Sequence, residues 1–326
     1  MRLWTRLGTA AVLLGVAALV APVSQRIAGA DDPIFVGWTA LAPGLTDTYD
    51  PTSENLCVAG KPRCIDAVIK EMKRRFKPQG LSCHHNAIFS LAYLRTTQTY
   101  KWASDQPGYF NDTPWVNHEA AVFAKYYFDA YDNWAAGRRD RAPQAWLIAF
   151  DAAAGPRVSG SGDLMLGMSA HINRDLPLAL AAIGIATPDG QSRKEDHDKV
   201  DQFLNTVIQP LLAEAAARFD PGVATISTPY GVGYTALFQQ VQAWRERAWR
   251  YAELLTEAPT AEARALVVQE IETNAAVEAN SIVATYGYLP PATTTNARDS
   301  FCAANNGASP PMAYAFGTPT AYGSVA

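Results

Sequence analysis

The sequence predicts an all-α protein, a single multi-helix globular domain with an irregular N-terminal arm and a coil C-terminal tail. Three observations support this prediction. Between Cys64 and about Leu289, apolar residues recur at spacings of three and four, which is the helical period. Proline and glycine clusters separate these stretches, and strand-like alternation finds little support. Without internal repeats, about 225 residues of helical pattern are enough to bury one core.

The first thirty residues have the pattern of a secretion signal. Arg2 and Arg6 precede an apolar stretch over residues 10–23, and small residues follow at 28–30. This order is typical of a cleaved signal peptide. The alternative, an uncleaved membrane anchor, is disfavoured because the stretch is shorter than the roughly 20 residues that span a bilayer and contains Pro22. We therefore expect a secreted protein.

Three further segments follow the signal peptide at residues 1–30. Residues 31–60 are rich in Pro, Gly, Thr and Asp, which predicts an extended N-terminal arm. Residues 61–288 form the helical domain. Residues 289–326 have little periodicity and many Pro, Thr, Ala, Gly and Asn residues, so an irregular C-terminal tail is expected there.

The charge of the chain limits its partners. The formal net charge of −4 becomes −7 without residues 1–30, because they contain three arginines and no acid. An acidic chain without a cluster of Lys and Arg lacks the electrostatic footprint of nucleic-acid binding, so nucleic acid is not expected as a partner. After the signal, no stretch is long and apolar enough for a stable membrane span.

The cysteines indicate a disulfide-bonded protein. An even set of four, Cys57, Cys64, Cys83 and Cys302, favours two disulfides in an oxidising compartment. A structural zinc site is the weaker alternative because no C-x-x-C pair occurs. Three pairings are possible. The short separation of Cys57 and Cys64 makes them the natural local bridge, which leaves Cys83 and Cys302 to tie the tail to the first helices.

Start and stop signals divide the helical domain. Residues 78–80 should end the first helix, and Thr113 should cap the third. The loop at 159–162 is expected to be a flexible connector, and Ser192 with Glu195 has the form of a capping box. The expected helices cover residues 65–76, 84–102, 113–136, 143–153, 163–185, 192–219 with a kink near 210, 233–256 and 261–285.

A histidine and an aspartate are expected to share one buried helix face. His171 and Asp175 are four residues apart, and the same stripe is otherwise apolar. A buried carboxylate needs a cation or several hydrogen-bond donors, and a metal ion would satisfy both residues. Pro177 lacks the amide that would bond the carbonyl of Asn173, so a bend is expected beside the pair.

Further ligands could converge on this pair. His197 and Asp201 repeat the H-x-x-x-D spacing on the next helix, and imidazole with carboxylate is a normal zinc environment. His118 offers another ligand from the third helix. A free carboxylate, Glu119 or Asp129, could then act as general base. His84 and His85 offer further nitrogens from the second helix.

A purely structural interpretation stays open. A His and an Asp one turn apart can satisfy each other and lock a helix into its neighbours. Taken singly, His118 and His197 are expected at the surface, whereas one of His84 and His85 should be packed. The sequence has no G-x-S-x-G elbow, P-loop, dinucleotide-binding glycine signature or H-E-x-x-H motif.

The segments 167–182 and 122–131 resemble an actinobacterial secreted family of unknown function, which is identified here by the motif AHINRDLP at residues 170–177. That resemblance indicates which proteins are related to this one, but it implies no activity. More loosely, the two H-x-x-x-D pairs are similar to those of all-helical zinc-dependent phospholipase C and P1 nuclease proteins. The sequence departs from that scheme because no histidine lies between Asp175 and His197.

Two functions are therefore expected from the sequence. In the first, a secreted metal-dependent hydrolase acts on an ester or phosphoester with water activated by zinc or another divalent ion. His171 and Asp175 would bind this ion with help from His197, Asp201 or His118. The alternative is a non-catalytic secreted protein that binds an apolar small molecule or lipid, in which His171 and Asp175 are a structural pair.

Overall fold

The apolar spacing produces helices throughout the part of the chain that the computed structural model describes, residues 44–226 and 232–306. No β-strand occurs among these residues, which confirms the all-α prediction; the predicted signal peptide lies outside them. Short 3₁₀ turns cover Arg139–Arg141 and Pro221–Ile226. The helices are α2 (Pro62–Leu81), α3 (Ala87–Ser104), α4 (Thr113–Ala135), α5 (Gln144–Ala154), α6 (Gly160–Ser169), a π segment (Ala170–Asp175), α7 (Leu176–Ile183), α8 (Lys194–Arg218), α9 (Val232–Glu257), α10 (Ala261–Tyr286) and α11 (Asn296–Asn305).

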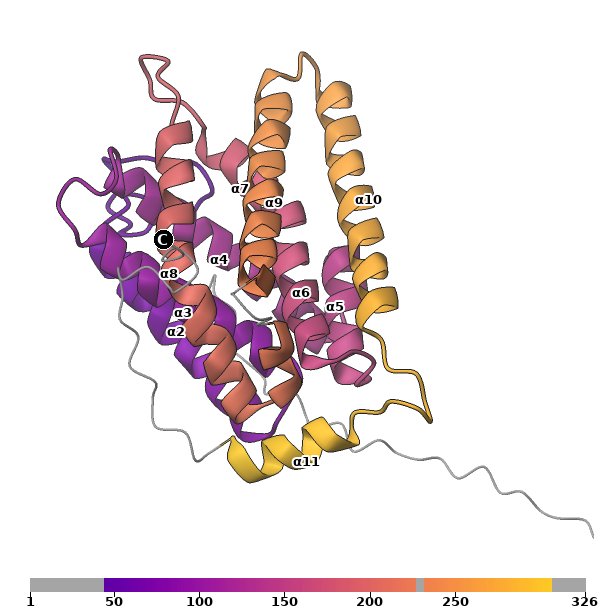
Figure 1. Ribbon diagram of the computed structural model, residues 1–326. Coiled ribbons are helices and arrows are strands. Elements are labelled where there is room, and N and C mark those ends of the chain that lie inside the picture. The colour runs from indigo at the N-terminus through magenta and orange to yellow at the C-terminus, as the bar shows by residue number, and fades with distance from the viewer. Residues whose placement is uncertain (1–43, 227–231, 307–326) are drawn as a thin grey trace, which may run out of the picture. The chain divides into compact units, whose positions relative to one another are not determined.

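Neighbouring helices pack along their lengths. Helix α3 lies between α2 and α8, and α9 and α10 form an adjacent pair of long helices joined by a short loop (Figure 1). Helix α9 packs on α7, while α10 packs on α5 and α6. Helix α4 contacts α2, α5, α7 and the π segment. Side chains from all of these helices, including Cys302 of α11, therefore meet in one main core.

Large aromatic side chains fill that core. Trp115, Trp146, Trp244 and Trp249 are each at most 2% exposed. Burial of such a side chain removes a large apolar area from water and is worth several kcal/mol. Close approach of α6 to α3 also requires Gly167, because a Cβ there would lie 2.2 Å from the ring of Phe89.

The predicted bend beside Pro177 takes the form of the π segment. The Leu176 amide donates to the carbonyl of His171, five residues earlier, whereas an α-helical bond would go to the residue four positions earlier. Pro177 has no amide for the carbonyl of Asn173, so the wider turn lies where the α-helical ladder is already interrupted. One helix predicted over 163–185 is therefore three consecutive segments, α6, π and α7.

The described part of the N-terminal arm, residues 44–60, is irregular as expected. Its end is closed by the Cys57–Cys64 disulfide. His118 on α4 holds it from beneath, with Nδ1 2.9 Å from the carbonyl oxygen of Cys57 and Nε2 2.9 Å from that of Asp47. His118 is thus buried, and the expectation of surface exposure is wrong because this segment covers it.

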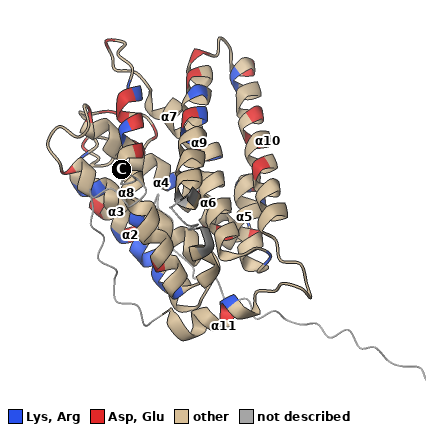
Figure 2. Cartoon of the chain, viewed as in Figure 1, with Lys and Arg blue, Asp and Glu red and all other residues tan. Residues whose placement is uncertain are grey.

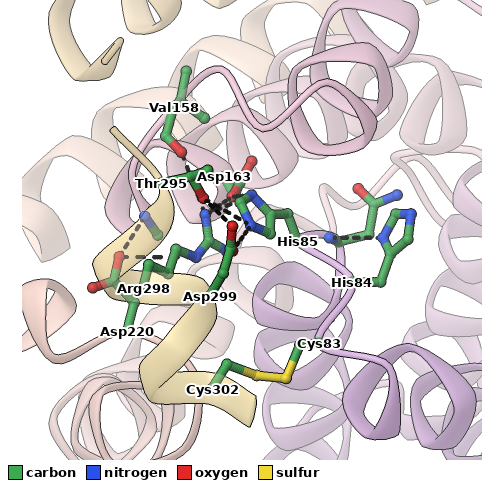
Figure 3. Close-up of polar contacts among 12 residues, drawn as sticks. Cys83, His84, His85, Val158, Asp163, Asp220, Thr295, Arg298, Asp299 and Cys302 are labelled. Carbon is green, nitrogen blue, oxygen red and sulfur yellow. Dashed lines mark hydrogen bonds and ion pairs between the residues drawn. A yellow bond between two sulfur atoms is a disulfide. The ribbon is translucent and has the colours of Figure 1, made fainter. Parts of the chain in front are cut away.

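The second predicted disulfide, Cys83–Cys302, joins α11 to the short connection between α2 and α3 (Figure 3). Arg298 is buried beside it and donates hydrogen bonds to Asp163 at 2.5 Å and to the carbonyl of Val158 at 3.3 Å. The tail predicted as coil from Leu289 therefore includes a docked helix. This helix is short and mostly polar, so its sequence has too little apolar periodicity to predict it.

His85 joins the same buried group. Its Nε2 lies 2.8 Å from Asp299, and its Nδ1 lies 2.9 Å from Arg298 (Figure 3). Burial, with the neighbouring Arg298 charge, lowers the pKa of His85 to about 4, so the ring accepts from Arg298 as a neutral base. As expected, one of the two adjacent histidines is packed, and the partly buried His84 accepts the amide of Asn86.

Several predicted helix boundaries are wrong. Asp112, rather than Thr113, accepts the Trp115 amide and caps α4. Helix α2 continues through Pro78, because a proline in the last turn removes only one intrahelical bond. The 159–162 segment is the start of α6, where the Ser159 side chain accepts the Gly162 amide. The expected capping box at α8 is missing, since the residue before this helix, Arg193, makes no side-chain cap.

The prediction that Lys and Arg do not cluster is wrong for α2 (Figure 2). Arg75 on this helix is buried and binds Glu71 and Asp132. Exposed basic residues lie along the same helix: Arg63, Lys70, Lys73, Arg74 and Lys77. Among the described helices, none is long and apolar enough to cross a membrane.

The two disulfides should contribute unequally to stability. The Cys83–Cys302 bridge closes a loop of 219 residues and the Cys57–Cys64 bridge one of seven. On a loop-entropy basis, replacing the first pair by serines should lower the free energy of unfolding by about 5 kcal/mol, against about 2 kcal/mol for the second. Urea denaturation of the two double variants under non-reducing conditions measures this difference. Equal losses would contradict the idea that the long bridge restrains the chain.

Candidate functional site

An apolar cavity of about 150 Å³ lies between α3, α4, α6, α8 and α9. It is built from the apolar faces of these helices, including a stripe of Val200, Leu204, Val207 and Leu211 on α8. Cavities of about this volume accommodate a benzene-sized molecule. Aromatic rings from α3, α4 and α8, those of Phe89, Tyr93, Phe123 and Phe203, also line it.

His171 and Asp175 form the predicted buried pair, and His171 lines the cavity. The carboxylate of Asp175 accepts three hydrogen bonds. Its Oδ2 receives His171 Nδ1 at 2.9 Å and Trp146 Nε1 at 2.8 Å, and its Oδ1 receives Arg174 at 3.0 Å. This arrangement supplies the cation and donors that a buried carboxylate needs, so Asp175 is satisfied by protein groups alone.

The bond to Asp175 fixes the protonation of the His171 ring. Because the carboxylate can only accept, we assign the ring proton to Nδ1, which leaves Nε2 as an acceptor. Nε2 is buried, with no hydrogen-bond partner among the described residues. Burial lowers the pKa of His171 even though Asp175 opposes the shift, so the ring is neutral near pH 7.

Aromatic neighbours hold this ring in place. Phe123 stacks on His171 with ring centroids 3.4 Å apart and an angle of 5° between the planes. Tyr93 meets it edge-on at 4.6 Å. The direction of the Nε2 lone pair is thus fixed by packing as well as by Asp175.

Glu119 is the second buried polar group on the cavity wall. Its side chain is 6% exposed, and Oε2 makes no hydrogen bond with any described residue. Burial raises the pKa of Glu119 to about 7; Arg245 opposes this shift and Asp196 adds to it. The side chain is therefore largely protonated below neutral pH. Of the two predicted general bases it is the one in the cavity, since Asp129 is outside it and pairs with Lys125 at 2.9 Å.

Both residues of the second H-x-x-x-D pair contact an arginine. Arg245 on α9 donates to Asp201 at 2.7 Å and to the backbone carbonyl of His197 at 2.5 Å. The His197 ring contacts Trp249, and burial followed by the Arg245 charge puts its pKa well below the ordinary value. His197 is buried, so the expectation of exposure is wrong.

The predicted metal ligands do not meet at one point. His171 and Asp175 bind each other, His197 and Asp201 contact Arg245, and His118 bonds two backbone carbonyls. Within residues 44–226 and 232–306, no group of three His, Cys, Asp or Glu side chains is arranged to hold a metal ion. Sequence reasoning missed Arg245, although its place between Val241 and Trp249 on an apolar helix face signalled a buried arginine.

Comparison with known proteins identifies the family. Neither the curated proteins nor the solved structures contain a match. A family model described as "Family of unknown function (DUF5995)" matches residues 65–285, the span from α2 to α10 that contains the cavity. Because the match covers more than half of the chain, the protein belongs to the DUF5995 family of unknown function.

Proposed function

We propose that this protein is a secreted binding protein for a small apolar molecule, which occupies the cavity beside His171 and Glu119. The observation that carries the proposal is a largely apolar cavity lined by His171 and Glu119, each of which has a buried polar atom, Nε2 and Oε2 respectively, without a partner in the described residues. Ligand sites typically combine such an apolar lining with a few polar groups that orient the ligand.

The secreted location rests on the sequence. The N-terminal pattern of basic, apolar and small residues favours export. Two disulfides among the described residues are compatible with an oxidising compartment. The ligand is then expected to be an extracytoplasmic molecule.

Filling the cavity should abolish ligand binding. Ala92 lines the cavity, and Ala92→Leu would place three more carbon atoms in it. Toluene at a hundredfold excess over its dissociation constant should stabilise the wild type by about 2.7 kcal/mol, and it should leave the variant unchanged. Thermal unfolding with and without toluene measures the effect. The control is Ala276→Leu on α10, outside the cavity, which should keep the wild-type response; an unchanged response in Ala92→Leu would contradict the proposed site.

Glu119 should make stability and ligand binding pH-dependent. Its folded pKa is raised from 4.5 to about 7, so its protonation stabilises the folded state at low pH. This contribution, about 3 kcal/mol, should decline as pH rises through the interval from 4.5 to 7 and be absent above it. Ionisation also places a charge in the cavity, which should weaken toluene binding above pH 7.

Glu119→Gln should remove both effects, because the amide stays neutral. Urea denaturation and toluene binding at pH 5 and pH 8 provide the measurements. A pH dependence that is identical in wild type and Glu119→Gln would show that Glu119 is not the group responsible.

The metal-dependent hydrolase expected from the H-x-x-x-D pairs can be tested directly. Because Arg174 and Arg245 already neutralise Asp175 and Asp201, we expect less than about a tenth of an equivalent of any transition metal in protein purified without chelator. Elemental analysis of such protein gives the answer. One equivalent of zinc that is lost in His171→Ala and retained in His84→Ala would favour the hydrolase over the binding protein.

A further inference from the structure

The unpartnered Nε2 atom of His171 indicates a property of the ligand in addition to its apolar character. In the neutral ring, the bond from Nδ1 to Asp175 makes Nε2 a hydrogen-bond acceptor, and His171 is one of the residues that line the cavity. His171 is only 3% exposed, and Nε2 has no partner among the residues described. A buried acceptor left without a donor is unfavourable, because it has lost its hydrogen bonds to water.

We propose that the ligand carries a hydroxyl group that donates a hydrogen bond to Nε2 of His171. This inference rests on the proposed function, because it concerns the same cavity. The ligand class is a small, neutral, mostly apolar molecule with one hydroxyl, such as a phenol or a short alcohol.

Several other polar groups on the wall are already engaged. The Thr97 hydroxyl donates to the carbonyl of Tyr93 at 2.9 Å, and the Tyr100 hydroxyl donates to Asn117 at 2.5 Å. Arg245 is bound to Asp201 and to the carbonyl of His197. Tyr93 and Thr96 also line the cavity. Of the polar atoms on the lining residues, His171 Nε2 and Glu119 Oε2 are the ones buried without a partner among the described residues, and of these Nε2 is the one that can only accept.

The packing around His171 suits a single fixed hydrogen bond. Phe123 covers one face of the imidazole and Tyr93 meets it edge-on, while Asp175 holds the opposite nitrogen. Because the ring is already held on these sides, it loses little conformational entropy when it accepts a hydrogen bond from the ligand. The bond should therefore discriminate strongly between molecules of the same shape. A carbonyl or ether of the same size brings only an acceptor and would repel the Nε2 lone pair.

Phenol and toluene test this inference because they have nearly the same shape. Isothermal titration calorimetry of the full mature chain at pH 6 should show phenol binding about tenfold more tightly than toluene, since one net hydrogen bond is worth about that factor. Anisole, which has no hydroxyl proton, should show no such gain. Toluene that binds as tightly as phenol overturns the hydroxyl inference and leaves the proposed function intact, whereas failure of all three to bind overturns both.

Two variants identify the acceptor. In Glu119→Gln the preference for phenol should persist, and in His171→Phe it should disappear while toluene still binds. A preference that is lost in Glu119→Gln and kept in His171→Phe overturns the assignment to His171.

Nitrogen NMR of the wild-type protein decides the question if His171→Phe does not fold. The ¹⁵N spectrum should show Nδ1 of His171 protonated and Nε2 unprotonated, and phenol should move the Nε2 resonance upfield. An Nε2 that carries the proton, or one that does not respond to phenol, overturns the inference.

Discussion

Burial of the Asp175 carboxylate is the constraint on which the centre of the molecule depends. A fully buried charge is tolerated only with donors around it, and these donors come from separate elements. Trp146 comes from α5, while His171 and Arg174 come from the π segment. Arg174 also binds Glu272 on α10 at 2.8 Å. The carboxylate therefore ties three parts of the chain together, and it fixes both the position and the tautomer of the His171 ring.

Arginine provides the cation for buried and half-buried acids elsewhere in the described chain. Asp201 binds Arg245, Asp163 binds Arg298, and Glu214 binds Arg95. Guanidinium groups suit this role because they stay charged and offer several donors in one plane. The spacing of His and Asp along one helix shows that the two side chains are neighbours, but it does not show which cation neutralises them. A metal ion and an arginine from a distant helix leave the same local pattern.

Local features were predictable from the sequence, whereas long-range partners other than the disulfide cysteines were not. The helical period placed α9 and α10 almost to the residue, and cysteine spacing gave both disulfides. The i,i+4 rule gave the His171–Asp175 contact, and Pro177 gave the interruption of its helix. The partnership of Arg245 with Asp201 spans 44 residues and depends on how α8 and α9 pack, which no local pattern encodes.

Unlike these arginine-paired acids, Glu119 lines the cavity and has a carboxyl oxygen, Oε2, without a partner among the described residues. Arg245 lies near enough to oppose the rise in the Glu119 pKa, yet its guanidinium donates to Asp201 and to the carbonyl of His197. Glu119 therefore takes up a proton as the pH falls below about 7. The His171 ring facing the same cavity is also uncharged, because burial outweighs Asp175. When both groups are neutral, neither carries a charge that would attract an ion. Their polar atoms can still form hydrogen bonds with a neutral molecule.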